Sequence, residues 1–156
     1  MKSASIAELK KELKYRSPEQ LMDYCLAMAR FKLESKELLT YLVFESEDEQ
    51  AYIQSVKDYI ATEFNAINAA NFYYIKKSVR KILRQTKRYI RYSKKKETEA
   101  ELLIYFCQEL KAFTPSISRN KVLTNTYNTQ IRLAKNAINK LHPDLQYDYR
   151  IMLEDL

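Results

Sequence analysis

The residues between Phe64 and Lys96 combine eleven cations with no aspartate or glutamate. The net charge of the 156-residue chain is +7, so this segment accounts for all of its excess positive charge. The cations are Lys76, Lys77, Arg80, Lys81, Arg84, Lys87, Arg88, Arg91, Lys94, Lys95 and Lys96. Lys and Arg bind phosphate oxygens through charge-assisted hydrogen bonds, and Arg can hold two oxygens at once. The segment is therefore a candidate binding site for a polyanion.

The spacing of these cations predicts that they share one face of a helix over about residues 72–93. At about 100° per residue, the apolar positions fall on one side of the helix and the cations on the other. The apolar side holds Ile75, Val79, Ile82, Leu83, Thr86, Tyr89 and Ile90. At 1.5 Å per residue, the cationic face would be about 30 Å long.

Seven of these cations are the residues that we expect to contact phosphates, and we call them the basic ridge. They are Lys77, Arg80, Lys81, Arg84, Lys87, Arg88 and Arg91. The same wheel places Tyr92 at the edge of the ridge, where its ring could stack on a base or on an arginine. Lys94, Lys95 and Lys96 are already favoured by their place at a helix C-terminus, before an acidic helix start. They need no ligand.

Other interpretations of the basic ridge remain open. An anionic bilayer surface, an acidic protein or polyphosphate would suit it as well as nucleic acid, although the apolar face is needed for the core. The ridge is also compatible with a face that is only solvated and binds nothing. The acidic residues at 45 and 47–49 would then relieve the repulsion among its cations. If Arg80, Arg84 and Arg91 pair with the chain's own carboxylates, the nucleic-acid hypothesis loses most of its support.

Composition excludes several classes of enzyme. A chain of this length usually holds roughly eleven glycines, and this one holds none. The phosphate-binding loop, the dinucleotide fingerprint and the nucleophile elbow all need glycine. Because tight hairpin turns need it too, an all-β fold is disfavoured. We therefore expect no enzymatic activity and assign no catalytic residue.

The metal-ligating residue types are too sparse for a metal site. His142 is the only histidine, and with Asp144 and Asp148 it matches no known ligand spacing. Leu141-His142-Pro143 is more typical of a turn at a helix terminus. Cys25 and Cys107 each lie among apolar residues with no second thiol nearby, so we expect buried, reduced thiols and no zinc. No cofactor is implied.

Helix-start patterns recur along the chain. Ser5 to Glu8 matches a capping box, and Ser17-Pro18-Glu19-Gln20 places Ser, Pro and Gln at favoured positions. Further helices are predicted over about 36–44, from 46–49, over 72–93, from a Thr98 cap, over about 119–141 and after Pro143. The asparagines at 65, 68 and 71 stand where left-handed, helix-ending geometry is expected.

These elements predict a single all-α domain over residues 1–156. We expect seven to eight helices in antiparallel hairpins, forming either a compact orthogonal array or a short α-α superhelix of the HEAT type. The signature residues of HEAT repeats are absent. No run of apolar residues is long enough for a signal peptide or a membrane span, so a cytoplasmic location is expected.

Two functions are compatible with this fold. The leading hypothesis is a non-enzymatic binding module whose basic helix, over about 72–96, docks RNA or DNA. The alternative is a protein–protein adaptor of the α-solenoid type whose basic face is only solvated. The aromatic cluster Phe72-Tyr73-Tyr74 leaves open a contact patch for a partner or a second subunit. The polar face at 120–139 is expected to be exposed, with a groove lining as the less favoured alternative.

Overall fold

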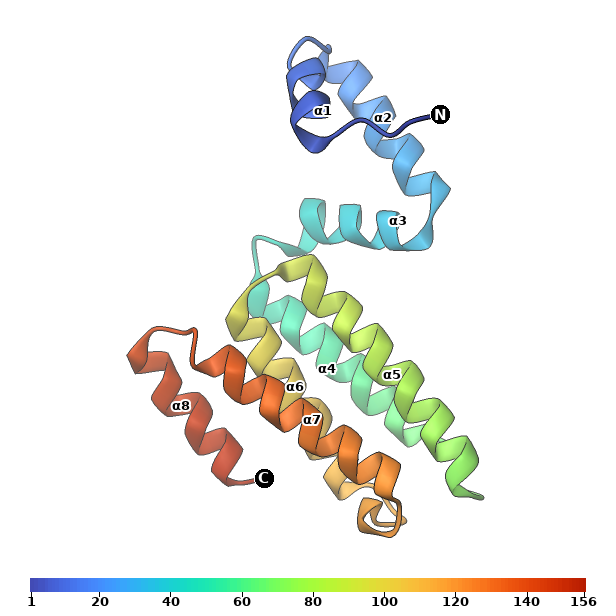
Figure 1. The fold of residues 1–156 in the computed structure, drawn as a ribbon, viewed down its shortest axis with the longest axis vertical. Coiled ribbons are helices and arrows are strands. Elements are labelled where there is room, and N and C mark those ends of the chain that lie inside the picture. The colour runs from blue at the N-terminus through green and yellow to red at the C-terminus, as the bar shows by residue number, and fades with distance from the viewer. The chain divides into compact units, whose positions relative to one another are not determined.

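A computed structural model describes residues 1–156, which fold into helices with no strand (Figure 1). The predicted all-α class and the predicted number of helices are confirmed. The α-helices are α1 (Ile6–Leu13), α2 (Pro18–Phe31), α3 (Leu33–Thr40), α4 (Glu49–Asn65), α5 (Phe72–Ser93), α6 (Lys96–Ala112), α7 (Lys121–Ile138) and α8 (Pro143–Glu154). A π-helical turn over Tyr41–Glu45 and a 3-10 turn over Ile117–Arg119 complete the chain. No helix is both long and apolar enough to cross a bilayer.

The chain divides into two compact units, whereas a single domain was expected from its length. The N-terminal unit comprises residues 1–44 and the C-terminal unit comprises residues 45–156. The division falls within the π-helical turn. We describe each unit by itself.

The C-terminal unit is an up-and-down bundle built around α6. This helix packs against α4, α5, α7 and α8, and eight of its residues are buried. Successive helices of the unit run in alternating directions, side by side, in Figure 1. The predicted antiparallel hairpins are thus present. Because one central helix touches four others, the unit resembles a bundle more than a superhelix, in which each repeat contacts only its neighbours.

The N-terminal unit has almost no interior. Helices α1, α2 and α3 contain no buried residue, and only Tyr41 of this unit is buried, at 4% exposure. The main packing within the unit is between α2 and α3. A helix that buries no apolar face gains little from tertiary packing. These helices therefore depend on local capping and on whatever covers their apolar side chains.

The predicted helix starts are largely confirmed by side-chain caps. Ser5 and Ser17 each accept a hydrogen bond from the amide three residues ahead, and Glu8 and Gln20 accept one in return from the Ser amides. His142 caps α8, because its Nδ1 accepts from the Asp144 amide at 3.4 Å. His142 thus lies in a turn at a helix terminus, as the sequence predicted.

Three local expectations were wrong. The asparagines at 65, 68 and 71 do not adopt left-handed geometry; Asn71 instead caps α5, and the one residue with positive φ is Lys94, at 60°. Thr98 does not cap α6, since the helix begins at Lys96 and the Thr98 side chain is buried. The third helix begins at Leu33 rather than near residue 36. Asn68 instead accepts from the Ala70 amide, and the Thr98 hydroxyl donates to Glu49, which is distant in sequence.

The two cysteines have different environments, which corrects the expectation that both are buried. Cys107 is fully buried in α6, whereas Cys25 is exposed on α2. Burial raises the pKa of the Cys107 thiol to about 12. Because the thiolate is the reactive form, Cys107 is unreactive in the folded protein near neutral pH.

We therefore expect a disulfide reagent such as Ellman's reagent to modify one thiol rapidly at pH 8 and the second only after denaturant is added. The rapid phase should disappear in a Cys25→Ser variant and persist in a Cys107→Ser variant. Two thiols reacting at equal rates in the native protein would show that Cys107 is accessible, contrary to this structure.

Candidate nucleic-acid interface

Helix α5 positions the basic ridge over the length that the sequence predicted. Asn71 accepts a hydrogen bond from the Tyr74 amide at 3.2 Å and so fixes the start of the helix. Ile75, Val79 and Ile82 are at most 1% exposed, and they anchor the opposite face in the core. Since this face is fixed, the cations must point away from the core.

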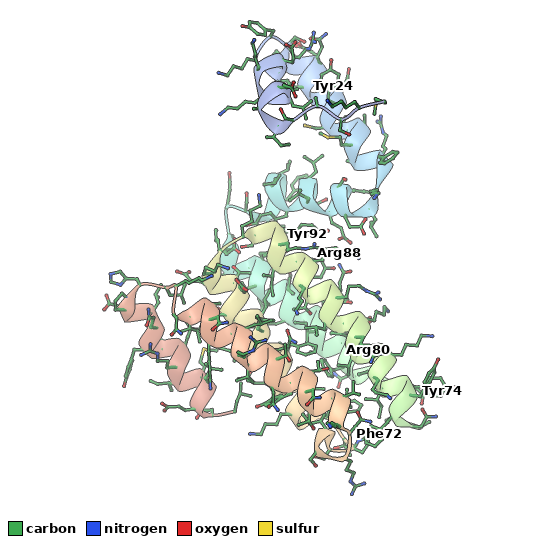
Figure 2. All side chains as sticks on the ribbon, viewed as in Figure 1. Tyr24, Phe72, Tyr74, Arg80, Arg88 and Tyr92 are labelled. Carbon is green, nitrogen blue, oxygen red and sulfur yellow. The ribbon has the colours of Figure 1, made fainter.

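Most of the ridge is exposed, and the protein does not neutralise Arg80, Arg84 or Arg91. Lys77, Arg80, Lys81, Arg84 and Arg91 are exposed, whereas Lys87 and Arg88 are half-buried. Figure 2 shows Arg80 and Arg88 on α5, between Tyr74 near its start and Tyr92 near its end. No ion pair joins Arg80, Arg84 or Arg91 to a carboxylate. The internal pairing that would have weakened the nucleic-acid hypothesis is absent at these three positions.

The chain's own acids neutralise only part of the cationic face. Lys81 Nζ lies 3.2 Å from Glu63, but its side chain is 65% exposed, and an exposed pair of this kind contributes little to stability. Asp48, expected to relieve the ridge, instead caps α4 by accepting from the Ala51 amide. Glu49, another residue of the acidic patch at 45 and 47–49, pairs with Lys95, which lies outside the ridge.

The prediction for Tyr92 was wrong. Its side chain is only 8% exposed and its ring packs at 6.2 Å from that of Tyr89. Tyr89 in turn packs edge-on against Tyr59 of α4, at 5.6 Å. This flank of α5 therefore faces aromatic neighbours rather than solvent. Tyr92 cannot stack on a base without leaving the core.

The cationic surface extends beyond the ridge because Glu49 holds the junction between α5 and α6. The hydroxyls of Ser93 and Thr98 both donate to Glu49 Oε1, and Lys95 Nζ lies 2.8 Å from Oε2. Lys94 adopts left-handed geometry between the two helices. A hollow of about 470 Å³ results, lined by Ile90, Arg91, Lys94, Lys95, Lys96 and Glu99. The sequence interpretation had explained these three lysines by helix dipoles alone.

Further hollows follow the side of α5 that faces α7. Both helices pack against α6, and one hollow of about 260 Å³ takes residues from all three. It is lined by Lys87, Ile90, Arg91, Glu99, Leu103 and Leu133, so it adjoins the hollow at the α5–α6 junction through three shared residues. Lys87 and Arg91 of α5 therefore lie at the rim of a depression and not on a flat surface.

The residues of α7 that line a third hollow beside α5 are mostly polar. A hollow of about 310 Å³ is lined by Leu83, Val122, Asn125, Thr126, Thr129 and Gln130. Gln130 donates from Nε2 to the Thr126 carbonyl at 3.2 Å, while its Oε1 has no hydrogen-bond partner. Most of the polar face at 120–139 is exposed, as the sequence predicted, including Asn125, Asn128 and Thr129. Part of it also lines this hollow, so the two roles considered from the sequence coexist.

The structure contains no group of three or more His, Cys, Asp or Glu side chains arranged to hold a metal ion. No family model, curated protein or solved structure matches this chain. What the chain does must therefore be inferred from the geometry of its own residues.

Proposed function

We propose that this chain is a non-enzymatic nucleic-acid-binding module that docks the phosphate backbone on the basic ridge of α5. The observation that carries the proposal is that Arg80, Arg84 and Arg91 are exposed on one helix without a carboxylate partner. Unpaired arginines repel one another. A row of phosphates relieves that repulsion and gives each guanidinium a bidentate partner.

The surroundings of the ridge support nucleic acid over a small anion. The ridge continues into the lysine-lined hollow at the α5–α6 junction, so the cationic surface is longer than one phosphate group requires. The groove wall on α7 supplies Asn125, Thr126 and Thr129, side chains that hydrogen-bond to base edges or sugars. Phosphate contacts fix position along a strand, and polar side chains of this kind distinguish bases.

The proposal is tested by fluorescence anisotropy with labelled single-stranded RNA and duplex DNA at about 50 mM and 200 mM salt. About six phosphate contacts predict a slope of log affinity against log salt near −5 for a duplex, and a smaller slope for a single strand. Across this range duplex affinity should fall roughly a thousandfold. An absence of binding to either probe at the lower salt, by a folded protein, would retire the proposal in favour of a protein partner.

A further inference from the structure

Two exposed tyrosines lie at the start of the helix that carries the basic ridge. Tyr73 is 67% exposed and Tyr74 is 44% exposed, both in the first turn of α5. They are two of the five large apolar or aromatic side chains exposed on the C-terminal unit. In Figure 2, Tyr74 lies at the start of α5 and Arg80 farther along the same helix. Adjacent exposed rings beside a charged surface call for an explanation, whereas isolated apolar side chains on a surface do not.

Helical periodicity places Tyr73 in line with the basic ridge. Lys77 and Arg80 follow it by four and seven residues, which are the spacings of about one and two helical turns. Residues four apart lie on the same face of a helix, with their Cβ atoms about 5–6 Å apart. The ring of Tyr73 therefore lies at the first position of the row of cations that we propose to contact phosphates.

The two tyrosine rings hold each other in a defined orientation. Their centroids lie 5.5 Å apart and their planes are at 77°, an edge-to-face arrangement. Tyr73 stays mostly exposed in this arrangement, so a further planar group can pack against it. Tyr92, which the sequence placed at the edge of the ridge, is buried. The exposed aromatic rings of α5 are thus at the start of the helix and not at its end.

We propose that Tyr73 and Tyr74 form a stacking platform for an unpaired base of a single-stranded nucleic acid. This role rests on the proposed function, because phosphates on the ridge are needed to bring a base to the rings. Proteins that bind single strands combine a cationic track for the backbone with aromatic rings for the bases. A strand whose phosphates contact Lys77 and Arg80 can place a neighbouring base on Tyr73. In a duplex, each base is already paired and stacked, so its face is not available to a tyrosine.

A Tyr73→Ala/Tyr74→Ala variant should lose roughly five- to hundredfold in affinity for a labelled single-stranded DNA, the effect of removing one stacked base. Its affinity for the duplex of the same sequence should stay within about twofold of wild type, because the phosphate contacts are retained. The slope of log affinity against log salt should be unchanged for both probes, since the substitution removes no charge. Fluorescence anisotropy at about 50 mM salt measures both affinities.

Three matched controls separate stacking from other effects. Tyr73→Phe/Tyr74→Phe keeps both rings and should bind as wild type does. Tyr147→Ala removes a tyrosine that is 68% exposed on α8, and it should also bind as wild type does. An abasic single strand keeps every phosphate but offers no base, so wild type and the alanine variant should bind it equally. Circular dichroism checks that the alanine variant keeps its helix content, which is expected because both side chains are exposed.

Failure of the stacking platform is distinguishable from failure of the proposed function. Single-strand binding that the alanine variant retains in full would overturn the platform and leave the ridge as a nucleic-acid site. Equal losses with the abasic and the complete strand would also overturn the platform, because the tyrosines would then act without a base. A folded wild type that binds neither probe would overturn both proposals.

Discussion

Replacing Arg80, Arg84 and Arg91 by glutamate is expected to weaken nucleic-acid binding at least about a thousandfold at low salt. The change removes three phosphate contacts and places three anions among the remaining ones. The slope of log affinity against log salt should fall from near −5 to about −2 or less. Because all three side chains are exposed and unpaired in the free protein, stability should be unaffected. The measurement is anisotropy with the same probes used for wild type.

The control for this result reverses three exposed cations elsewhere. Lys11, Lys14 and Arg16 follow one another at and beyond the end of α1, and their change to glutamate alters net charge by the same amount. This variant should keep most of the affinity if the ridge is the site. Equal losses in the two variants would mean that the overall charge, and not the ridge, governs binding.

A conservative variant separates charge from geometry. Lysine at positions 80, 84 and 91 keeps every positive charge but cannot form the bidentate arginine contact. We expect the salt slope to stay near that of wild type while affinity falls by roughly three- to thirtyfold, through the lost second hydrogen bonds. An affinity equal to that of wild type would show that the ridge acts only as a row of point charges.

Phe106→Ala should lower the free energy of unfolding of the C-terminal unit by about 3–5 kcal/mol. Phe106 is fully buried in α6, and its ring packs at 5.5 Å from that of Phe64 on α4. Truncation removes this ring contact and leaves a cavity that the surrounding bundle cannot fully close. Urea denaturation followed by circular dichroism measures the effect, seen as a lower midpoint with an unchanged slope.

Tyr147→Ala is the matched truncation at the surface. Tyr147 is 68% exposed on α8, so removal of its ring should change stability by less than about 0.5 kcal/mol. A loss at Phe106 no larger than the loss at Tyr147 would show that α6 is not the centre of the core.

The sequence by itself determined the features that depend on near neighbours in the chain. The caps at Ser5 and Ser17 form because a side chain meets an amide three residues away. The face of α5 that carries Arg80 and Arg84 follows from helical periodicity, and the bounds of that helix follow from the same pattern. The absence of glycine had already disfavoured a β fold.

Only the tertiary structure decided which surfaces are covered. Cys25 and Cys107 both lie among apolar residues in sequence. Cys25 is nevertheless exposed on α2, whereas Cys107 is buried in α6, which packs against four other helices. Tyr92 was placed at the edge of the ridge by its angle on the helix, but its ring is buried beside Tyr89, which itself packs against Tyr59 of α4. Angles on an isolated helix do not say which neighbour lies beside it.

The hollows beside α5 and the junction of α5 and α6 also depend on tertiary packing. Thr98 matches a helix cap in sequence, but Glu49, far away in the chain, is a stronger partner for its hydroxyl because a carboxylate accepts a charge-assisted bond. The same contact brings the lysines at 94–96 around one hollow. The polar residues of α7 reach the flank of α5 only because both helices pack on α6. Contacts between distant segments depend on the packing of the whole bundle, which no local pattern records.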